Sequence, residues 1–351
     1  MVHSTIDVAG RKVGAGQPCF IIAEAGVNHN GESEMARRLI DVAVRAGADA
    51  VKFQTFKAER LVTRDAPKAE YQSQTTDPGE THFDMIRRLE MSPQMHVELI
   101  DYCREQGILF LSSPFDEESA DLLDELGVAA FKIPSGEITN LGYLAHIASK
   151  GKPMIVSSGM SCLGEVEAAV RAIQEAGNRD YVLLHCVSNY PADPADVNLR
   201  AMHTMATAFG APVGYSDHTL GIEVPMAAVA LGACVIEKHF TLDRNLPGPD
   251  HRASLEPDEL ATMVRGIRIV EESLGHGRKE PAPSEAETAA VARKSLVAAQ
   301  DIPFGTTLAK EMIAVMRPGT GLPPAMRTYL VGLSTRTSIA RGELFTLEML
   351  R

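Results

Sequence analysis

The sequence predicts an α/β fold, a TIM (β/α)8 barrel followed by a small C-terminal domain. Eight apolar, β-rich runs alternate with longer helix-like segments, and eight such units in about 250 residues match this barrel in size and order. Nearly all polar residues of these runs fall at their C-terminal ends, where such a barrel builds its active site. After residue 274 the composition changes and a separate, loop-rich region begins.

The predicted strands begin as nearly continuous apolar runs, which is typical of parallel strands that are covered by helices. The segments between them have amphipathic spacing, as Met35, Leu39, Ile40 and Val44 show in the first segment. Glycine ends several of these segments, where it favours a helix C-terminus. We expect strands at residues 19–26, 50–56, 108–114, 129–135, 154–160, 181–188, 212–217 and 234–241.

The last helix-like segment, 256–274, is followed by a charged linker that is rich in Gly and Pro. We therefore expect a barrel domain over residues 1–274, a linker over 275–287 and a small domain over 288–351. The small domain has short β-rich runs separated by Gly and Pro. Alone it could bury only a modest core, so we expect it to pack on another barrel or subunit.

Composition excludes several classes of function. The 351 residues are 45% hydrophobic, enough for a substantial core, and no run approaches the length of a membrane span. The five cysteines form no CxxC pair and residues 1–18 carry no signal-peptide core, so we expect a reduced, cytoplasmic protein. The net charge of -12 disfavours nucleic acid and anionic membranes as partners, because both require a basic surface.

Two histidines stand at the ends of the last two predicted strands. His218 follows a strand that reads Gly-Tyr-Ser-Asp, and His239 ends the run Val-Ile-Glu-Lys. Adjacent parallel strands would bring both imidazoles toward one divalent metal ion, and the absence of a nearby cysteine pair argues against structural zinc. The alternative is that both histidines bind the substrate directly by hydrogen bonds.

A second group of polar residues suits an anionic substrate. Lys52 and Lys132 project from two inner strands, and serines end the neighbouring strands. Lysine supplies point charge and hydroxyls supply hydrogen-bond donors, so this set could bind a phosphate and a carboxylate, the two groups of phosphoenolpyruvate. With a metal that polarises a carbonyl, the chemistry is carbon-carbon bond formation at an aldehyde. The alternative, a Schiff-base aldolase that uses Lys52, would need neither the second lysine nor a metal.

These residues lie in motifs that resemble the sialic acid synthase (N-acetylneuraminate synthase) family. The motifs cover the whole predicted barrel, and the segment around Arg317 resembles the antifreeze-like (SAF) domain of that family. The matching motifs are IIAEAGVNHNG (21–31), KFQTF (52–56), FKIPSGE (131–137), SSGM (157–160), GYSDHT (214–219), EKHFT (237–241) and GPDHRASL (248–255).

The resemblance implies condensation of phosphoenolpyruvate with N-acetylmannosamine and water to give N-acetylneuraminate and phosphate. The cofactor would be a divalent metal held by His218 and His239, usually Mn²⁺, with Mg²⁺ or Co²⁺ as alternatives. We expect catalytic roles for Glu24, Lys52, Glu137, Asp217, His218 and His239. We expect substrate binding by Gln54, Ser113, Lys132, Ser135, Ser157, Ser188, Tyr190, Ser216, Glu237, Asp250 and Arg317.

Family members are domain-swapped homodimers, so the resemblance implies that Arg317 reaches the sugar N-acyl group in the barrel of a second copy. Ser188 departs from the pattern, because the sialic acid enzymes have asparagine at this position. Residues 71–80 are expected to form a lid near the sugar.

Two alternatives to this function remain. Phrases such as KFQTFKAERLV and DRNLPGPDHRASLEP also resemble N,N'-diacetyllegionaminate synthases, whose sugar is 2,4-diacetamido-2,4,6-trideoxymannose. The other alternative is a non-catalytic carbohydrate-binding protein with a degenerate barrel. Such a barrel would be expected to lose some of the site residues that this sequence retains.

Overall fold

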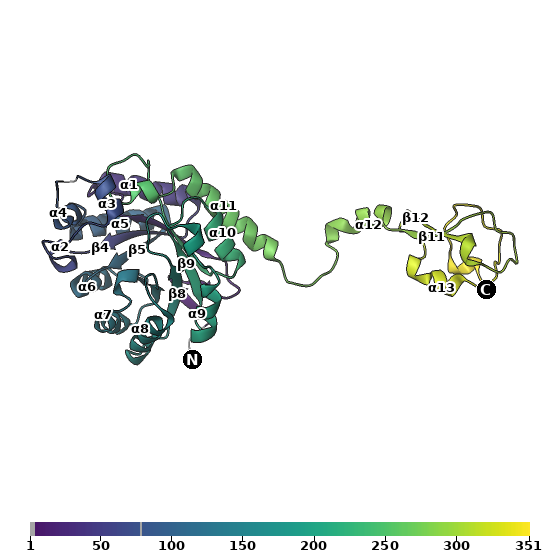
Figure 1. Cartoon of the computed structure of the whole chain (residues 1–351), viewed down its shortest axis with the longest axis horizontal. Helices are drawn as coiled ribbons and strands as arrows, with labels where there is room; N and C mark the ends of the chain where they lie inside the picture. The colour runs from purple at the N-terminus through teal and green to yellow at the C-terminus, as the bar shows by residue number, and fades with distance from the viewer. Residues whose placement is uncertain (1–3, 78) are drawn as a thin grey trace. The chain divides into compact units, whose positions relative to one another are not determined.

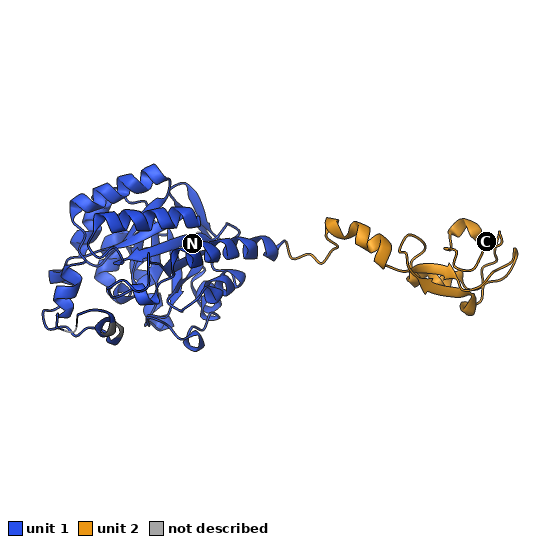
Figure 2. Cartoon of the chain, turned by 90° about the horizontal axis from the view of Figure 1, so that it is seen from above, with its two compact units in different colours: residues 1–275 blue, residues 276–351 orange. Residues whose placement is uncertain are grey.

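The computed structural model describes residues 4–77 and 79–351. The chain divides into two compact units, Met1–Gly275 and His276–Arg351, which Figure 2 shows in different colours. Residue 78 of the predicted lid segment lies outside the described residues. Within the described residues no helix is long and apolar enough to cross a membrane.

The first unit is a parallel barrel with helices around it (Figure 1). Within the described residues its sheet has eight strands, hydrogen-bonded in the order β5-β4-β3-β10-β9-β8-β7-β6, and β5 and β6 at the two ends of this order lie side by side. The predicted TIM barrel is confirmed, and each strand lies within its predicted range. The strands are β3 (Phe20–Gly26), β4 (Ala50–Thr55), β5 (Leu109–Pro114), β6 (Phe131–Ile133), β7 (Met154–Ser157), β8 (Tyr181–Cys186), β9 (Val213–Asp217) and β10 (Val235–His239).

One helix of the outer ring follows each barrel strand, and its buried apolar face packs on the outside of the sheet. Local sequence sets the ends of these helices: the Ser92 hydroxyl caps the N-terminus of α5, and Gly47 and Gly107 adopt the left-handed conformation after α1 and α5. The ring consists of α1 (Ser33–Ala46), α5 (Pro93–Gln106), α6 (Glu117–Glu125), α7 (Leu141–Ala148), α8 (Leu163–Glu175), α9 (Ala201–Phe209), α10 (Glu223–Ala230) and α11 (Pro257–Leu274).

Short helices interrupt the connection between β4 and α5. They are α2 (Ala58–Leu61), α3 (Glu70–Thr75) and α4 (His82–Arg87), and the predicted lid residues therefore include a helical turn rather than loop alone. A small apolar cluster, with Phe56, Phe83 and Met85 at its centre, holds α2 and α4 together beyond the ends of the strands.

A β-hairpin that the sequence analysis did not predict closes the bottom of the barrel. Its strands are β1 (Thr5–Val8) and β2 (Arg11–Gly14), joined by a turn in which Ala9 and Gly10 both have positive φ. Ile6, Val8 and Val13 are fully buried against the inward-facing apolar residues at the N-terminal ends of the barrel strands. The interior of the barrel therefore has a dry apolar floor.

The second unit is small and built mostly of turns. Its antiparallel strands are β11 (Ser295–Ala298) and β12 (Ile313–Met316), and its helices are α12 (Ala286–Ala292) and α13 (Arg327–Leu330). Its own core includes Leu296, Ile313, Leu330, Ile339 and Phe345.

Candidate active site

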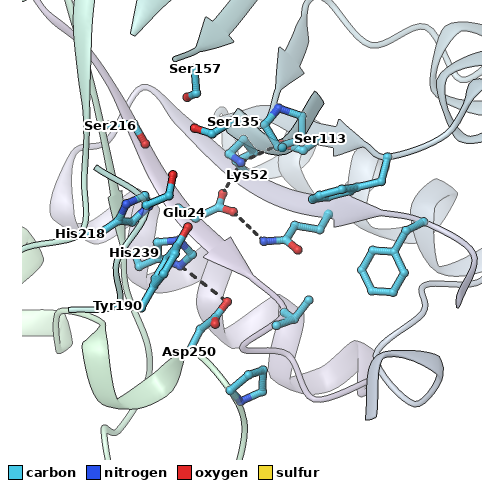
Figure 3. A pocket seen from close by; sticks show the side chains of 18 of the residues that line it. Glu24, Lys52, Ser113, Ser135, Ser157, Tyr190, Ser216, His218, His239 and Asp250 are labelled. Atoms are coloured by element: carbon cyan, nitrogen blue, oxygen red, sulfur yellow. Dashed lines mark hydrogen bonds and ion pairs between the residues drawn. The ribbon is translucent and has the colours of Figure 1, made fainter. Parts of the chain in front are cut away.

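A cavity of about 340 Å³ opens above the apolar floor, at the carboxyl ends of the barrel strands. Its position follows from the two-residue period of each strand. Along β3, for example, Phe20 and Ile22 face the floor and Glu24 is the next inward-facing residue. The inward positions one step beyond the floor are polar or cysteine on each strand. They are Glu24, Lys52, Ser113, Lys132, Ser157, Cys186, Ser216 and Glu237. Figure 3 labels five of them, Glu24, Lys52, Ser113, Ser157 and Ser216.

Four of these residues form a buried charge cluster at the base of the cavity. The Lys52 ammonium lies 3.0 Å from Glu24 and 3.5 Å from Glu237, and it donates a hydrogen bond of 2.8 Å to Ser113. Lys132 lies 3.3 Å from the other oxygen of Glu237. All four charged side chains are at most 6% exposed. The cluster is therefore well shielded from solvent.

Burial and mutual charge set the proton affinities in this cluster. Burial raises the pKa of Glu24 above its ordinary value, although Lys52 opposes the shift. Burial would also raise the pKa of Glu237, but Lys132 and Lys52 outweigh it and hold this pKa low. The pKa of Lys52 is raised because its two carboxylates outweigh burial, whereas burial lowers the pKa of Lys132. Glu237 is thus the fixed anion of the cluster, and Glu24 is the carboxyl that can exchange a proton near neutral pH.

Serines and a glycine form a small hollow beside the lysines. The Ser135 hydroxyl accepts a hydrogen bond of 3.0 Å from the Gly159 amide, and the buried Ser157 hydroxyl has no hydrogen-bond partner among the described residues. A Cβ atom on Gly159 would lie 2.2 Å from the Ser188 hydroxyl and 2.7 Å from that of Ser135. Only glycine fits there, and the hollow keeps free donors that suit an anion.

The two predicted metal ligands face each other on the wall formed by β9 and β10. The rings of His218 and His239 have centroids 5.4 Å apart, and Tyr190 packs on His218 at 4.1 Å. His218 Nδ1 donates a hydrogen bond of 2.7 Å to the Val187 carbonyl, which fixes the ring and, when the ring is neutral, leaves the lone pair on Nε2. Asp250 lies 4.0 Å from His239 Nδ1 (Figure 3).

This donor set fits a divalent metal ion. His239 Nδ1 is buried and has no hydrogen-bond partner among the described residues. Burial, with His218 and Lys52, lowers the pKa of His239 far below its ordinary value, so the ring is neutral at pH 7 and keeps a free lone pair. Burial also raises the pKa of Asp250 to about 6. Within residues 4–77 and 79–351, no group of three or more His, Cys, Asp or Glu residues is arranged to hold a metal.

The structure brings most of the predicted site residues to this cavity but not all of them. Asp217 points outward from β9, where its carboxylate lies 2.5 Å from buried Lys238 and accepts hydrogen bonds from Tyr215 and Thr219. These contacts occupy the carboxylate away from the cavity, so the position of Asp217 gives the predicted catalytic role no support.

Two further predicted residues lie outside the cavity lining. Glu137 ends the short helical turn after β6 and accepts a hydrogen bond of 2.9 Å from Asn140. The predicted catalytic role of Glu137 therefore has no support from the geometry. Arg317 lies in the second unit, where its side chain is exposed and donates a hydrogen bond to the Ala292 carbonyl.

One side of the cavity was not predicted from the sequence. Cys186 lines it, and the period-two pattern of β8, which places Leu184 on the inside, could have indicated this. The apolar residues at the mouth were not predicted either. They come from the segment between β4 and α5 and from the end of β5. Gln72 of the predicted lid lines the cavity as well.

Residues 39–279 match the NeuB family, and residues 293–351 match the SAF domain. The chain belongs to the NeuB family. The predicted resemblance and the predicted SAF domain are therefore confirmed, and the chain is an enzyme of this synthase type.

Relatives of known function match nearly the whole chain. The N,N'-diacetyllegionaminic acid synthases of Legionella pneumophila and Campylobacter jejuni are each 50% identical to it, over 94% and 88% of this chain and 94% and 92% of their own length. The crystal structure of N-acetylneuraminic acid (sialic acid) synthetase from Leptospira borgpetersenii, in complex with citrate, superposes with a TM-score of 0.73 at 38% identity. It covers 82% of this chain and 95% of that one.

Proposed function

We propose that this NeuB family member condenses phosphoenolpyruvate with an N-acetylated mannosamine-type sugar and water, giving a nonulosonic acid and phosphate. The observation that carries the proposal is the arrangement in one cavity of a lysine–serine hollow and a facing pair of histidines. The hollow suits the phosphate and carboxylate of phosphoenolpyruvate. The histidine pair suits a metal ion next to a carbonyl oxygen.

Lys52 and Lys132 would bind the anionic groups of phosphoenolpyruvate, and the hydroxyls of Ser113, Ser135 and Ser157 would donate to its oxygens. Ser188 and Ser216 also line the cavity. Because the Ser157 hydroxyl is unpaired, it can donate without breaking an existing hydrogen bond.

His218 and His239 would hold a divalent metal, Mn²⁺ by resemblance with Mg²⁺ or Co²⁺ as alternatives. When bound, the metal would act as a Lewis acid on the sugar aldehyde. The Val187 carbonyl and the packing of Tyr190 hold His218 in the orientation that this requires. Tyr190, Gln54 and Asp250 would face the sugar.

Glu24 would accept and return the protons of the reaction. C3 of phosphoenolpyruvate forms a bond to the aldehyde carbon, water adds at C2, and the bond between C2 and the phosphate oxygen breaks. The added water must lose a proton, and the raised pKa of Glu24 suits a general base that works near neutral pH. Gln54 donates a hydrogen bond of 3.3 Å to Glu24 and orients its carboxylate.

Of the two candidate sugars, 2,4-diacetamido-2,4,6-trideoxymannose is favoured, because the two relatives at 50% identity are N,N'-diacetyllegionaminic acid synthases. N-acetylmannosamine, which gives N-acetylneuraminate, is the second candidate, since the Leptospira structure is described as a sialic acid synthetase.

The oligomer and the role of the SAF domain follow from the resemblance. A homodimer in which the SAF domain of one copy covers the barrel of the other would bring exposed Arg317 to a sugar N-acyl group. The location would be cytoplasmic.

Phosphate release from phosphoenolpyruvate tests the proposal. With Mn²⁺ and either sugar, the purified full chain should release phosphate in a sugar-dependent manner, and the His239→Ala variant should not. No release with either sugar, or undiminished release in the variant, would refute the proposed reaction.

A further inference from the structure

A thiol lies among the polar groups of the cavity. Within residues 4–77 and 79–351 the cavity lining contains one cysteine, Cys186, which is the last residue of β8. It pairs in register with Ser216 of β9. Cys186 is 5% exposed, and it lines the cavity. The condensation proposed above gives this thiol no role, so it is a nucleophile that the reaction leaves unused.

The thiol lies between the histidine side and the serine side of the cavity. Its Sγ is 3.7 Å from the Ser188 hydroxyl and 3.7 Å from His218 Nδ1. Ser188 is close to Ser135, because a Cβ atom on Gly159 would lie 2.2 Å from the hydroxyl of the first and 2.7 Å from that of the second. The thiol of Cys186 is therefore part of the lysine–serine hollow.

A feature independent of the thiol shows that this hollow is built for a ligand. The Ser157 side chain is 2% exposed, it lines the cavity, and its hydroxyl has no hydrogen-bond partner among the described residues. Lys52 and Lys132 line the same cavity. A small anion would accept a hydrogen bond from the unpaired hydroxyl and lie close to the two ammonium groups.

We propose that Cys186 is a modification site for small anionic alkylating compounds, and that phosphoenolpyruvate excludes such compounds from it. This inference rests on the proposed function, because it takes the hollow to be the phosphoenolpyruvate site. Lys52 and Lys132 would hold the carboxylate of the compound while its electrophilic carbon meets Sγ. Sγ forms a bond to this carbon, the carbon–halogen bond breaks, the halide leaves with the bonding electrons, and the thiol proton passes to water. The attached carboxylate then occupies the hollow and blocks phosphoenolpyruvate.

Iodoacetate and iodoacetamide are matched probes for this site. They share the electrophilic carbon and are nearly the same size, but only iodoacetate is an anion. The proton affinity of a thiol cancels from the ratio of its rates with the two reagents, so this ratio reports the charge around the thiol. Positively charged clefts raise the local concentration of anions by about 10- to 1,000-fold. Glu24 and Glu237 offset part of the lysine charge, so we expect a ratio about tenfold higher at Cys186 than for 2-mercaptoethanol, an uncharged free thiol.

Cys162 is the internal control. It is exposed at the start of α8 and lies outside the cavity lining. It should react equally with and without phosphoenolpyruvate, and its ratio of rates should not be raised. The Cys162→Ser variant should be inactivated by iodoacetate as the wild type is, whereas Cys186→Ser should keep its own initial rate of phosphate release after treatment. Mass spectrometry of the peptides identifies the modified cysteines directly, so the test does not depend on the activity of the Cys186→Ser variant.

The full chain with Mn²⁺ is treated with each reagent in the presence and absence of phosphoenolpyruvate. We expect phosphate release, assayed after removal of the reagent, to fall in parallel with modification of Cys186. Phosphoenolpyruvate at about ten times its Kd should slow both by about tenfold, because only the unoccupied site reacts.

Three results would overturn the inference: Cys186 unmodified while Cys162 reacts, modification of Cys186 that phosphoenolpyruvate does not slow, or a ratio of rates at Cys186 no higher than that of 2-mercaptoethanol. If the untreated chain releases no phosphate with either sugar, the proposed function itself is refuted. An active chain that gives one of the three results refutes the modification site alone.

Discussion

Replacing Glu237 with glutamine tests whether mutual neutralisation holds the charge cluster together. One carboxylate oxygen of Glu237 lies 3.3 Å from Lys132 and accepts a hydrogen bond of 2.8 Å from Ser216, and the other lies 3.5 Å from Lys52. Glutamine has nearly the same shape but no charge. The variant would leave two buried ammonium groups with Glu24 as their remaining carboxylate.

The expected loss of stability is large. Removing one partner of a buried ion pair lowers the free energy of unfolding by about 3–5 kcal/mol. The side chains are at most 6% exposed, so solvent screens these charges little. In the variant, Lys52 still forms its ion pair with Glu24 at 3.0 Å. Lys132 can lose its proton, because burial already lowers its pKa, and this reduces the cost of leaving it without a carboxylate. We therefore expect a loss near the lower end, about 3 kcal/mol at pH 7.

Urea unfolding of the full chain, followed by circular dichroism, measures this loss. Ser216→Ala is the control, because it removes a hydrogen bond to Glu237 but no charge, and it should cost about 1 kcal/mol. Inorganic phosphate should stabilise Glu237→Gln more than wild type, since the anion would supply the missing negative charge. If Glu237→Gln costs no more than Ser216→Ala, the reasoning from charge neutralisation is refuted.

Three further predictions concern the metal, pH and the outer face of the barrel. Chelation of the metal should abolish phosphate release, and added Mn²⁺ should restore it. Calorimetric titration of the His239→Ala variant with Mn²⁺ should show no binding. Unchanged binding would exclude His239 as a metal ligand. Burial, with two neighbouring histidines, lowers the pKa of His29 from 6.5 to about 4, so the stability that depends on its neutral ring is complete above pH 6.5. The free energy of unfolding should fall by about 3 kcal/mol as the pH falls from 6.5 to 4. An equally steep fall in the free energy of unfolding of His29→Gln would contradict this prediction. Lys238→Met should lower the free energy of unfolding by about 3 kcal/mol, because it leaves the buried carboxylate of Asp217 without its ion-pair partner. The KM for phosphoenolpyruvate should not change. A raised KM would place the Asp217–Lys238 pair in the site.

The barrel could be predicted from the sequence because its strands are buried on both faces. Such strands read as continuous apolar runs, and the observed strands fall within the predicted ranges. The hairpin at residues 5–14 was missed because its signal is weak: three buried apolar residues, Ile6, Val8 and Val13, alternate with polar ones around a two-residue turn. Helices α2, α3 and α4 are too short to show a helical period.

The inward-facing residues of the site could also be predicted from the sequence, and the outward position of Asp217 shows how. Side chains alternate across a strand, so Ser216 and His218 face the cavity while Asp217 between them faces the helices. The same alternation places Glu237 and His239 inside and Lys238 outside. A position near a strand end was too coarse a criterion for choosing site residues. The alternation of inward- and outward-facing positions along the strand would have left Asp217 out of the predicted site. The apolar residues at the mouth of the cavity had no comparable signal, because short helices beyond the strand ends supply many of them.

The β1–β2 hairpin has a consequence for how the chain folds during synthesis. Residues 5–14 leave the ribosome before any barrel strand, and their tight turn lets the hairpin form locally within microseconds. The surface that buries Ile6, Val8 and Val13 includes Cys234 and Val235, so it is complete only when the last barrel strand has emerged. Until then the nascent chain carries an exposed apolar ribbon with open edges, which is a site for chaperone binding or aggregation. This hairpin, which is synthesised before the barrel strands, is thus among the last elements to pack into the fold.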